Sequence, residues 1–469
     1  MPENILDAAI LKELSVNNSY AQFTGTDAKI VVLDDDPTGV QTVNNVSVYT
    51  DWSKSSILQG FNEPGNMFFI LTNSRGFLRD KTERVHEEIA KNVCEAARET
   101  GKDFILISRG DSTLRGHYPL ETLTLKNAVE KYSDKKISGE IICPFFPEGG
   151  RYTIGNVHYV KENDKLVPAA MTEFALDKTF GYKNSDLGKY CEEKTNGEYK
   201  AENMIYIPLE TLKEGDVFGV KEKLVSAENF NKIIVNAVCY KDLAVFCEGL
   251  NMALKEGKSF MIRSAAALPK VLGGVKDIPL LKRDQMVNEN NKNGGIIIVG
   301  SHVKKTTRQL ELLKEGAPQI DYIEFDANKY RVAGGLKKEA QDITDRAEDD
   351  IKKGITVCVY TSRAVLDFNG DKEAALKASV EISDALTSVI TKLNVTPSFI
   401  VAKGGITSSD VGTKGLGVKK AVVLGQPAPG IPVWQTGEES KFPGLPYVIF
   451  PGNVGEETTL RDVVKELMQ

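Results

Sequence analysis

Short apolar runs rich in β-branched and aromatic residues alternate along this chain with longer amphipathic stretches. In the first half such runs occupy residues 29–33, 67–72, 103–108, 140–144, 204–208, 232–238 and 259–263. Each is followed by glycine or polar residues and then by a stretch such as Glu83–Thr100 or Ala244–Lys255, where apolar side chains recur every three or four positions. This order predicts parallel strands joined by crossover helices.

A polar segment at residues 281–294, LKRDQMVNENNKNG, interrupts this pattern, and the apolar run GIIIVGS restarts it at Gly295. Further strands are expected at 296–299, 322–325, 356–360, 398–401, 421–424 and 447–450. We therefore predict an α/β protein of two domains, residues 1–280 and 295–469, each a mostly parallel β-sheet flanked by helices, with 281–294 as the linker. Segment 156–212 is richer in charge and tyrosine, as in an insertion over the first sheet.

Composition narrows the classes of protein that this chain resembles. Its 469 residues are 41% hydrophobic, enough for more than one core, and its net charge of −6 provides no basic field for nucleic acid. The cysteines form no CxxC pair, and four histidines are too scattered for a zinc site. No apolar run reaches the length of a membrane span, and residues 1–19 carry acids unlike a signal peptide. We expect a cytoplasmic protein with no nucleic-acid or membrane partner, and leave open whether it is a homodimer.

Polar residues follow the strands of the first half, where ligands of open parallel sheets bind. They are Asp34, Asp35, Asp36 and Thr38 after the first strand, Arg75 after the second, Arg109, Asp111, Ser112 and Arg115 after the third, and Arg151 beyond the fourth. Consecutive carboxylates repel one another unless a cation faces them, so a general base beside hydroxyl-binding acids is one interpretation. Asp residues that cap a turn are the other. The arginines suit a small polyhydroxylated acid, although ion pairs with these Asp residues are equally compatible.

Three glycine-bearing loops follow strands of the second half. They contain Gly300 and Ser301, then Gly404, Gly405, Ile406 and Thr407, and finally Gly452 within Pro451–Gly455. Glycine lets backbone N–H groups approach a phosphate, and the second loop is expected to open a helix whose positive end faces the anion. The loops together predict a nucleotide site, although the Walker and GxGxxG fingerprints are absent.

These motifs, in this order from about Lys29 to the C-terminus, resemble those of the four-carbon acid sugar kinase family. The matching segments are Asp35–Gly39, Asp111–Gly116, Pro144–Arg151, Gly404–Ser408 and Gly452–Gly455, with Ser301 at the position of an ATP-contacting serine. Two departures stand out. Asp34 precedes the first motif, and Phe450 stands where the family usually has a lysine. Lys403, directly before the glycine pair, is a candidate replacement for that charge.

The resemblance implies transfer of phosphate from ATP, with Mg²⁺, to the terminal hydroxyl of threonate, erythronate or an oxo-tetronate, in a cleft between the domains. Asp35 or Asp36 would take the hydroxyl proton, with Asp111 a further catalytic candidate. The predicted sugar-acid contacts are Thr38, Arg75, Arg109, Ser112, Arg115 and Arg151, and the predicted nucleotide contacts are Ser301, Gly404, Gly405, Ile406, Thr407 and Gly452. The metal ligands stay unassigned. Two alternatives remain open: a two-lobed acid-sugar-binding or sensory protein without transfer, and a nicotinamide-dependent sugar-acid enzyme.

Overall fold

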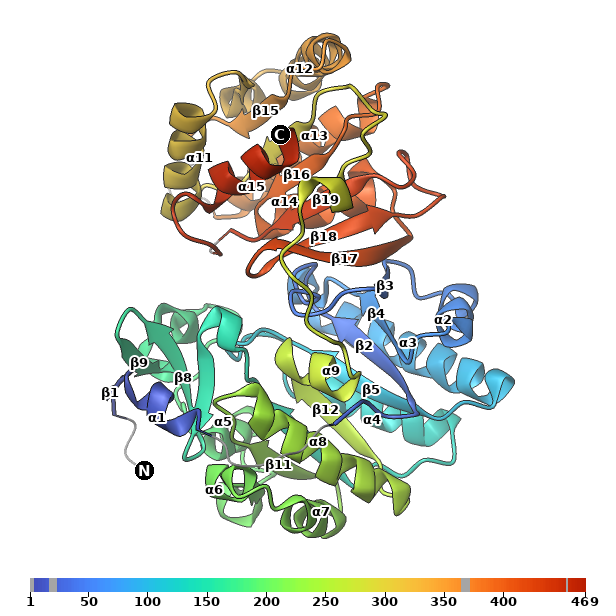
Figure 1. Ribbon diagram of the computed structural model, residues 1–469. Coiled ribbons are helices and arrows are strands. Elements are labelled where there is room, and N and C mark those ends of the chain that lie inside the picture. Colours follow the sequence, from blue (N-terminus) through green and yellow to red (C-terminus); the bar gives the residue numbers. More distant parts are fainter. Residues whose placement is uncertain (1–3, 17–22, 364–371, 453) are drawn as a thin grey trace. The chain divides into compact units, whose positions relative to one another are not determined.

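The computed structural model describes residues 4–16, 23–363, 372–452 and 454–469, which form two compact units (Figure 1). The first unit contains the described residues up to Thr42 together with Asp51–Asp277. The second contains Val43–Thr50 and Ile278–Gln469. Each predicted strand overlaps an observed one, and each unit is built on a mostly parallel sheet flanked by helices, which confirms the predicted α/β fold.

A parallel sheet forms the centre of the first unit. Its strands lie in the order β10 (Ile205–Ile207), β11 (Asn231–Val235), β6 (Gly139–Cys143), β12 (Phe260–Ser264), β5 (Phe104–Arg109), β2 (Lys29–Asp34) and β4 (Met67–Leu71). All neighbouring pairs run parallel. Strands β2 and β4 are buried along their whole length, because helices cover parallel sheets on both faces.

The helices of this unit carry the apolar spacing seen in the sequence. They are α2 (Lys54–Asn62), α3 (Arg79–Thr100), α4 (Leu120–Tyr132), α6 (Leu209–Lys213), α7 (Val217–Val225), α8 (Tyr240–Lys255) and α9 (Ala267–Leu272). Helix α3 buries Val85, Ile89 and Val93 on one face and ends at Gly101, whose φ of 66° is readily adopted by glycine. It packs against α2 and α4. The crossovers therefore place successive strand ends at one edge.

The charged, tyrosine-rich segment forms a small antiparallel sheet that the sequence analysis did not predict. Its order is β1 (Leu6–Asp7), β9 (Lys165–Pro168), β8 (Val157–Glu162) and β7 (Arg151–Ile154). Helix α1 (Ile10–Leu14) follows β1, and the turns η3 (Ala169–Met171) and η4 (Glu173–Leu176) lead on towards α5 (Leu187–Lys194). Tyr182 and Tyr190 are buried in the core beneath this segment. Their rings supply apolar surface to this core, although the segment as a whole is rich in charged residues.

The second unit contains a mixed sheet. The strand order is β3 (Val46–Tyr49), β17 (Lys420–Ala428), β18 (Ile431–Thr436), β19 (Pro446–Phe450), β16 (Ile400–Lys403), β13 (Ile296–Val299), β15 (Val357–Thr361) and β14 (Asp321–Phe325). Pairing is antiparallel from β3 to β19 and parallel from β19 to β14. The accompanying helices are α10 (Arg283–Met286), α11 (Lys304–Gly316), α12 (Gly335–Lys352), α13 (Lys372–Lys392), α14 (Gly405–Asp410) and α15 (Thr459–Met468). No helix among the described residues is long and apolar enough to cross a membrane.

Strand β3 lies in sequence between two segments of the first unit, but it belongs to the second unit. Its residues Val46 and Tyr49 pair with Val423 and Lys420 of β17, and all of β3 is buried. The sequence analysis predicted no strand here and counted these residues within the first domain, 1–280. They belong to the second unit because β17 offers them an antiparallel ladder, which a local pattern does not reveal.

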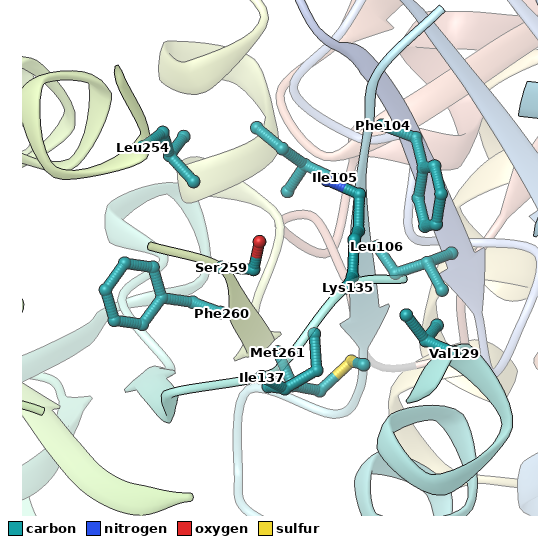
Figure 2. Close-up of a pocket in the computed structure, with 10 residues that line it drawn as sticks. All are labelled: Phe104, Ile105, Leu106, Val129, Lys135, Ile137, Leu254, Ser259, Phe260 and Met261. Atoms are coloured by element: carbon teal, nitrogen blue, oxygen red, sulfur yellow. The ribbon is translucent and has the colours of Figure 1, made fainter. Parts of the chain in front are cut away.

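A small recess lies at the amino ends of β5 and β12, where Figure 2 shows Phe104 and Phe260 among its lining side chains. Most of its lining is apolar, and the ammonium of Lys135 pairs with Asp103. The polar strand ends lie at the opposite edge of the same sheet, at Arg109 and Ser264. The recess is therefore separate from the residues described next.

Candidate functional site

The carboxyl edge of the first sheet brings the predicted acids and arginines together. Asp34 ends β2 directly beside Arg109, which ends β5, and the two are register partners. Arg75 lies in the turn η1 (Ser74–Gly76) that follows β4. Asp35 and Asp36 continue from β2 over the same edge. The strand-end rule thus placed these side chains in one cluster.

Within this cluster the arginines already bind the acids. Arg75 holds Asp35 with two bonds, Nε to Oδ2 at 3.0 Å and Nη2 to Oδ1 at 2.7 Å. Its Nη1 also lies 2.5 Å from Asp36 Oδ2. Arg109 Nη1 donates to Asp34 Oδ1 at 3.1 Å. Of the two interpretations of these arginines, the ion pairs are the one present, so the charge of each guanidinium is already balanced by acids.

The three neighbouring carboxyls differ in acidity. Burial raises the pKa of Asp34 to about 8, with Arg109 opposing it only in part. Burial also raises the pKa of Asp35 to about 6, against the charge of Arg75. For Asp36 burial is outweighed by Arg75 and Arg109, which lower its pKa. Near neutral pH, Asp34 is therefore mostly protonated while Asp35 and Asp36 are mostly ionised.

The loop after β2 folds back onto Asp34. A side chain at Gly39 would overlap the Asp34 carboxyl, so this position needs glycine. Thr38 donates from its N–H to Asp36 Oδ1 at 2.8 Å, and its hydroxyl binds the same oxygen. Asp36 thus caps the turn, which is the second of the two interpretations that the sequence offered for these acids. Asp34, which lies outside the recognised motif, packs against the loop that carries the motif.

The loop after β5 carries a second acid–arginine pair. Arg115 Nε donates to Asp111 Oδ2 at 2.6 Å, and the hydroxyl of Thr113 binds the same oxygen. Burial alone would raise the pKa of Asp111, but Arg75 and Arg115 outweigh it and hold that pKa well below its usual range. Ser112 is buried in this loop. Asp111 is therefore a fixed anion and a poor proton acceptor.

Arg151 differs from the other arginines. It begins β7, and its buried Nε finds no hydrogen-bond acceptor among the described residues, a feature that it shares with Arg109 Nε. No carboxylate within the described ranges lies at ion-pair distance from it. The guanidinium groups of Arg115 and Arg151 both lie against the ring of Phe174, with centroid distances of 5.0 and 5.7 Å. Among the predicted sugar-acid arginines, Arg151 is thus the one whose charge no described carboxylate balances at ion-pair distance.

Asp34, Asp35 and Asp36 are also candidate ligands for a magnesium ion. One carboxylate oxygen from each of Asp34, Asp35 and Asp36 lies within 4.8 Å of the others. Oxygen ligands suit Mg²⁺. However, Arg75 and Arg109 already pair with these carboxylates, and Asp34 favours the protonated form. This set of residues does not fit a resident magnesium ion.

In the second unit, three predicted loops follow the neighbouring parallel strands β13, β16 and β19. Thr306 joins two of them, since its hydroxyl lies 3.2 Å from both Ser301 Oγ and the carbonyl oxygen of Gly452. Gly404 has a φ of 125°, and a Cβ there would lie 3.0 Å from that of Ser301. The structure therefore gathers Ser301, Gly404 and Gly452. Asn453 lies outside the described residues.

Gly405 begins α14 as an exposed residue with open space above it. Ile406 beside it is 73% exposed, whereas Thr407 is buried against Gly300. The free amides of a first helical turn suit an anion, and the exposed glycine lets one approach. This loop fits a phosphate better than it fits an apolar ligand.

Lys403 is the candidate replacement for the lysine that the family usually has at the position of Phe450. It ends β16 beside its register partner Phe450, and its Nζ lies 4.1 Å from that ring. The ammonium is fully buried and donates to the carbonyls of Pro451 at 2.6 Å and Gly452 at 3.2 Å. Burial, with a smaller effect of Lys305, lowers its pKa to about 7.

The sequence analysis missed Arg363. It follows β15 and donates from Nη1 to the carbonyl of Ser301 at 2.6 Å and from Nε to that of Thr361 at 3.1 Å. The strand-end rule that found the other residues would have found this one. Arg363 fixes the loop that presents Ser301.

Two family models match the chain, a sugar-binding N-terminal domain over residues 30–272 and a nucleotide-binding C-terminal domain over residues 296–460. A solved Salmonella typhimurium LT2 protein, provisionally described as a tRNA synthase, is 16% identical with a TM-score of 0.68, and the match covers 93% of this chain and 98% of that one. A Haemophilus influenzae protein is 16% identical with a TM-score of 0.63, covering 94% and 100%. These two structures share the fold. No curated protein matches the chain significantly.

Proposed function

Because the chain belongs to the four-carbon acid sugar kinase family, we propose that it uses ATP to phosphorylate the terminal hydroxyl of a sugar acid of the threonate, erythronate or oxo-tetronate class. The observation that supports this proposal is that the two units present different chemical groups. One unit gathers acids and arginines suited to a hydroxy acid, and the other gathers glycine loops suited to phosphates. Phosphoryl transfer needs mainly such positioning and charge neutralisation.

On the sugar side, Asp35 is the proposed general base. Its pKa of about 6 leaves it ionised at neutral pH and still able to take a proton, whereas the lowered pKa of Asp36 makes that residue a weaker base. Arg75 orients both carboxylates. Arg151 is the proposed partner of the substrate carboxylate, because no carboxylate among the described residues lies at ion-pair distance from it, whereas Arg109 pairs with Asp34. Arg109 and Arg115 support the acids rather than the ligand.

On the nucleotide side, the open amides at Gly405 and Ile406 would receive phosphate oxygens, with Ser301 and Gly452 on the adjoining loops. Lys403 on β16 would supply a positive charge beside Phe450 on β19, the position at which the family usually has a lysine. Magnesium would arrive as the ATP–Mg complex, held by phosphate oxygens and water. This assignment agrees with the poor fit of a resident ion among the acids.

The test is a panel of four-carbon sugar acids with ATP–Mg, read by coupled release of ADP. We expect ADP release with at least one threonate, erythronate or oxo-tetronate, and none with the matching neutral tetritols. Tight binding of a sugar acid without ADP release would favour the binding or sensory alternative. Absence of binding across the panel would contradict the proposed substrate class.

A further inference from the structure

A buried arginine that the sequence analysis did not single out lies behind the acids of the first unit. Arg263 is near the carboxyl end of β12, the strand that pairs with β5, and it is 5% exposed. Its Nη2 donates to the carbonyl of Arg115 at 3.2 Å. Burial opposes its charge, but Tyr190, Glu121 and Asp35 outweigh burial and raise its pKa. The guanidinium therefore stays charged.

The acid that faces this arginine is Glu121, in the first turn of α4. It is fully buried, and its Oε2 lies 3.6 Å from Arg263 Nη1, within ion-pair distance but too far for a hydrogen bond. Neither of these two atoms finds a hydrogen-bond partner among the described residues. The other oxygen, Oε1, accepts from the hydroxyl of Ser74 at 2.8 Å, in the turn that carries Arg75. Glu121 thus balances Arg263 only from a distance, so the field of the arginine extends to other groups.

Asp35 is one of those groups, and the space beside Gly116 shows how near it lies. A Cβ at this glycine would be 3.7 Å from Arg263 Nη2, 3.7 Å from Asp35 Oδ2 and 3.9 Å from Glu121 Oε2. The three atoms therefore surround one position, which glycine leaves without a side chain. Charges interact more strongly in such a desolvated place than in water. The Glu121–Arg263 pair is close enough to act on Asp35.

Other titratable or charged groups also face these three side chains. They are Asp34 and Asp36 on the loop after β2, Arg75 in η1, Arg109 on β5, Asp111 and Tyr118 between β5 and α4, His86 on α3, and Tyr190, Cys191 and Lys194 on α5. Burial lowers the pKa of His86, whose Nε2 lies 3.9 Å from Glu121 Oε1, so the ring is neutral at neutral pH. Burial raises the pKa of Tyr118 and of Tyr190, so both phenols are neutral where Asp35 titrates.

We propose that Arg263 and Glu121 are positioning residues that set the acidity of Asp35. Arg263 favours the ionised carboxylate, and Glu121 limits this effect because it faces the same guanidinium. Through Ser74, Glu121 also holds the turn from which Arg75 binds Asp35. The role of Asp35 as general base rests on the proposed function, whereas the control of its acidity can be measured without it.

The test compares Arg263→Gln, Glu121→Gln and Arg263→Lys in the full-length protein. NMR of ¹³C-labelled aspartate carboxyls follows each titration, and the signal of Asp35 is the one that Asp35→Asn lacks. We expect its midpoint to rise by about 0.5–1 pH unit in Arg263→Gln, which loses a positive charge, and to fall by a similar amount in Glu121→Gln. Arg263→Lys should keep the wild-type midpoint. So should the control Arg98→Gln, which removes an exposed arginine from the last turn of α3.

Unchanged midpoints in both glutamine variants would overturn the proposal. Shifts of the same sign in both would also overturn it, because loosened packing changes burial in one direction whereas the two charges act in opposite directions. If Arg263→Gln does not fold, Glu121→Gln keeps the shape of its side chain and is judged alone, and a midpoint that does not fall refutes the proposal.

Activity gives a second measurement that separates this proposal from the proposed function. If a tetronate is phosphorylated with Asp35 as base, the rise of kcat with pH should move with the NMR midpoint in each variant. A rise that stays in place while the midpoint moves contradicts Asp35 as the base and supports the control of its acidity. Absence of ADP release with every tetronate contradicts the kinase, and the NMR midpoints still decide this proposal.

Discussion

Replacement of Lys403 by methionine should change how the stability of the second unit depends on pH. The lysine is fully buried, and the described residues around it offer carbonyls rather than a carboxylate. Methionine has a similar length and no charge. The variant therefore removes the cost of burying an ammonium along with two hydrogen bonds, and pH separates these two effects.

The sign and size follow from the pKa of Lys403, which falls from 10.5 to about 7 on folding. Between these values the unfolded chain binds the extra proton, so stability increases with pH and is lost as pH falls through 7. From pH 6 to pH 9 this one group should add about 2–3 kcal/mol to the free energy of unfolding. Methionine lacks that gain. The lost hydrogen bonds cost about 1–2 kcal/mol at every pH.

The assay is urea unfolding at pH 6, 7, 8 and 9, followed by tryptophan fluorescence. The chain has two tryptophans, so Trp52→Phe leaves Trp434, which is buried in β18 of the second unit, as the reporter. The stability of the Lys403 protein relative to Lys403→Met should increase by the calculated amount as pH rises. Lys352→Met, an exposed lysine on α12, should give curves parallel to those of the parent.

Parallel curves for Lys403→Met as well would refute the reasoning, since they would mean that the folded protein keeps this lysine charged across the range. Nucleotide binding gives a second reading. If the ammonium faces a phosphate in the complex, the variant should bind ATP about tenfold more weakly at pH 7. Unchanged ATP affinity would leave Lys403 as a support of the Pro451–Gly452 loop only.

Three further predictions concern the two half-sites. Asp35→Asn should lower kcat by about 10²–10⁴ and remove a rise in activity through about pH 6, which Asp36→Asn should keep; near wild-type kcat would exclude Asp35 as the base. Gly405→Ala should raise the KM for ATP without lowering Tm, whereas Gly404→Ala should destabilise the fold by about 1–3 kcal/mol through its φ of 125°. Arg151→Ala should weaken tetronate binding about 10- to 100-fold in calorimetry, and wild-type affinity would remove it from the site.

The pattern of apolar residues predicted the strands well, because each strand of a parallel sheet is buried on both faces and reads as a continuous apolar run. The same pattern did not predict features that depend on contacts between residues far apart in the chain. Strand β3 is short, and its pairing with β17 joins residues far apart in the chain. Tyr182 and Tyr190 looked polar in a charged segment, although their rings are buried. A local sequence carries no signal for such burial.

Candidate site residues were found for the same reason that the strands were, since parallel strand ends share an edge. Their partners could not be found this way. The sequence left open whether Arg75 binds a ligand or an Asp, and the answer depends on side-chain geometry across several strands. The difference between Arg151 and Arg75 also appears only in the structure, where Arg75 pairs with Asp35 and no carboxylate among the described residues pairs with Arg151.

Strand β3 makes the second unit discontinuous in sequence, which matters for any attempt to divide the protein. A fragment that starts at Ile278 lacks Val43–Thr50, so β17 loses its partner strand β3 and the Val423 carbonyl loses the hydrogen bond from the Asn45 N–H. An unpaired strand of this kind promotes aggregation. A synthetic peptide of residues 43–50 should pair with the fragment by strand addition and restore its solubility. We therefore expect the two halves of this chain to be separable by complementation rather than by simple truncation.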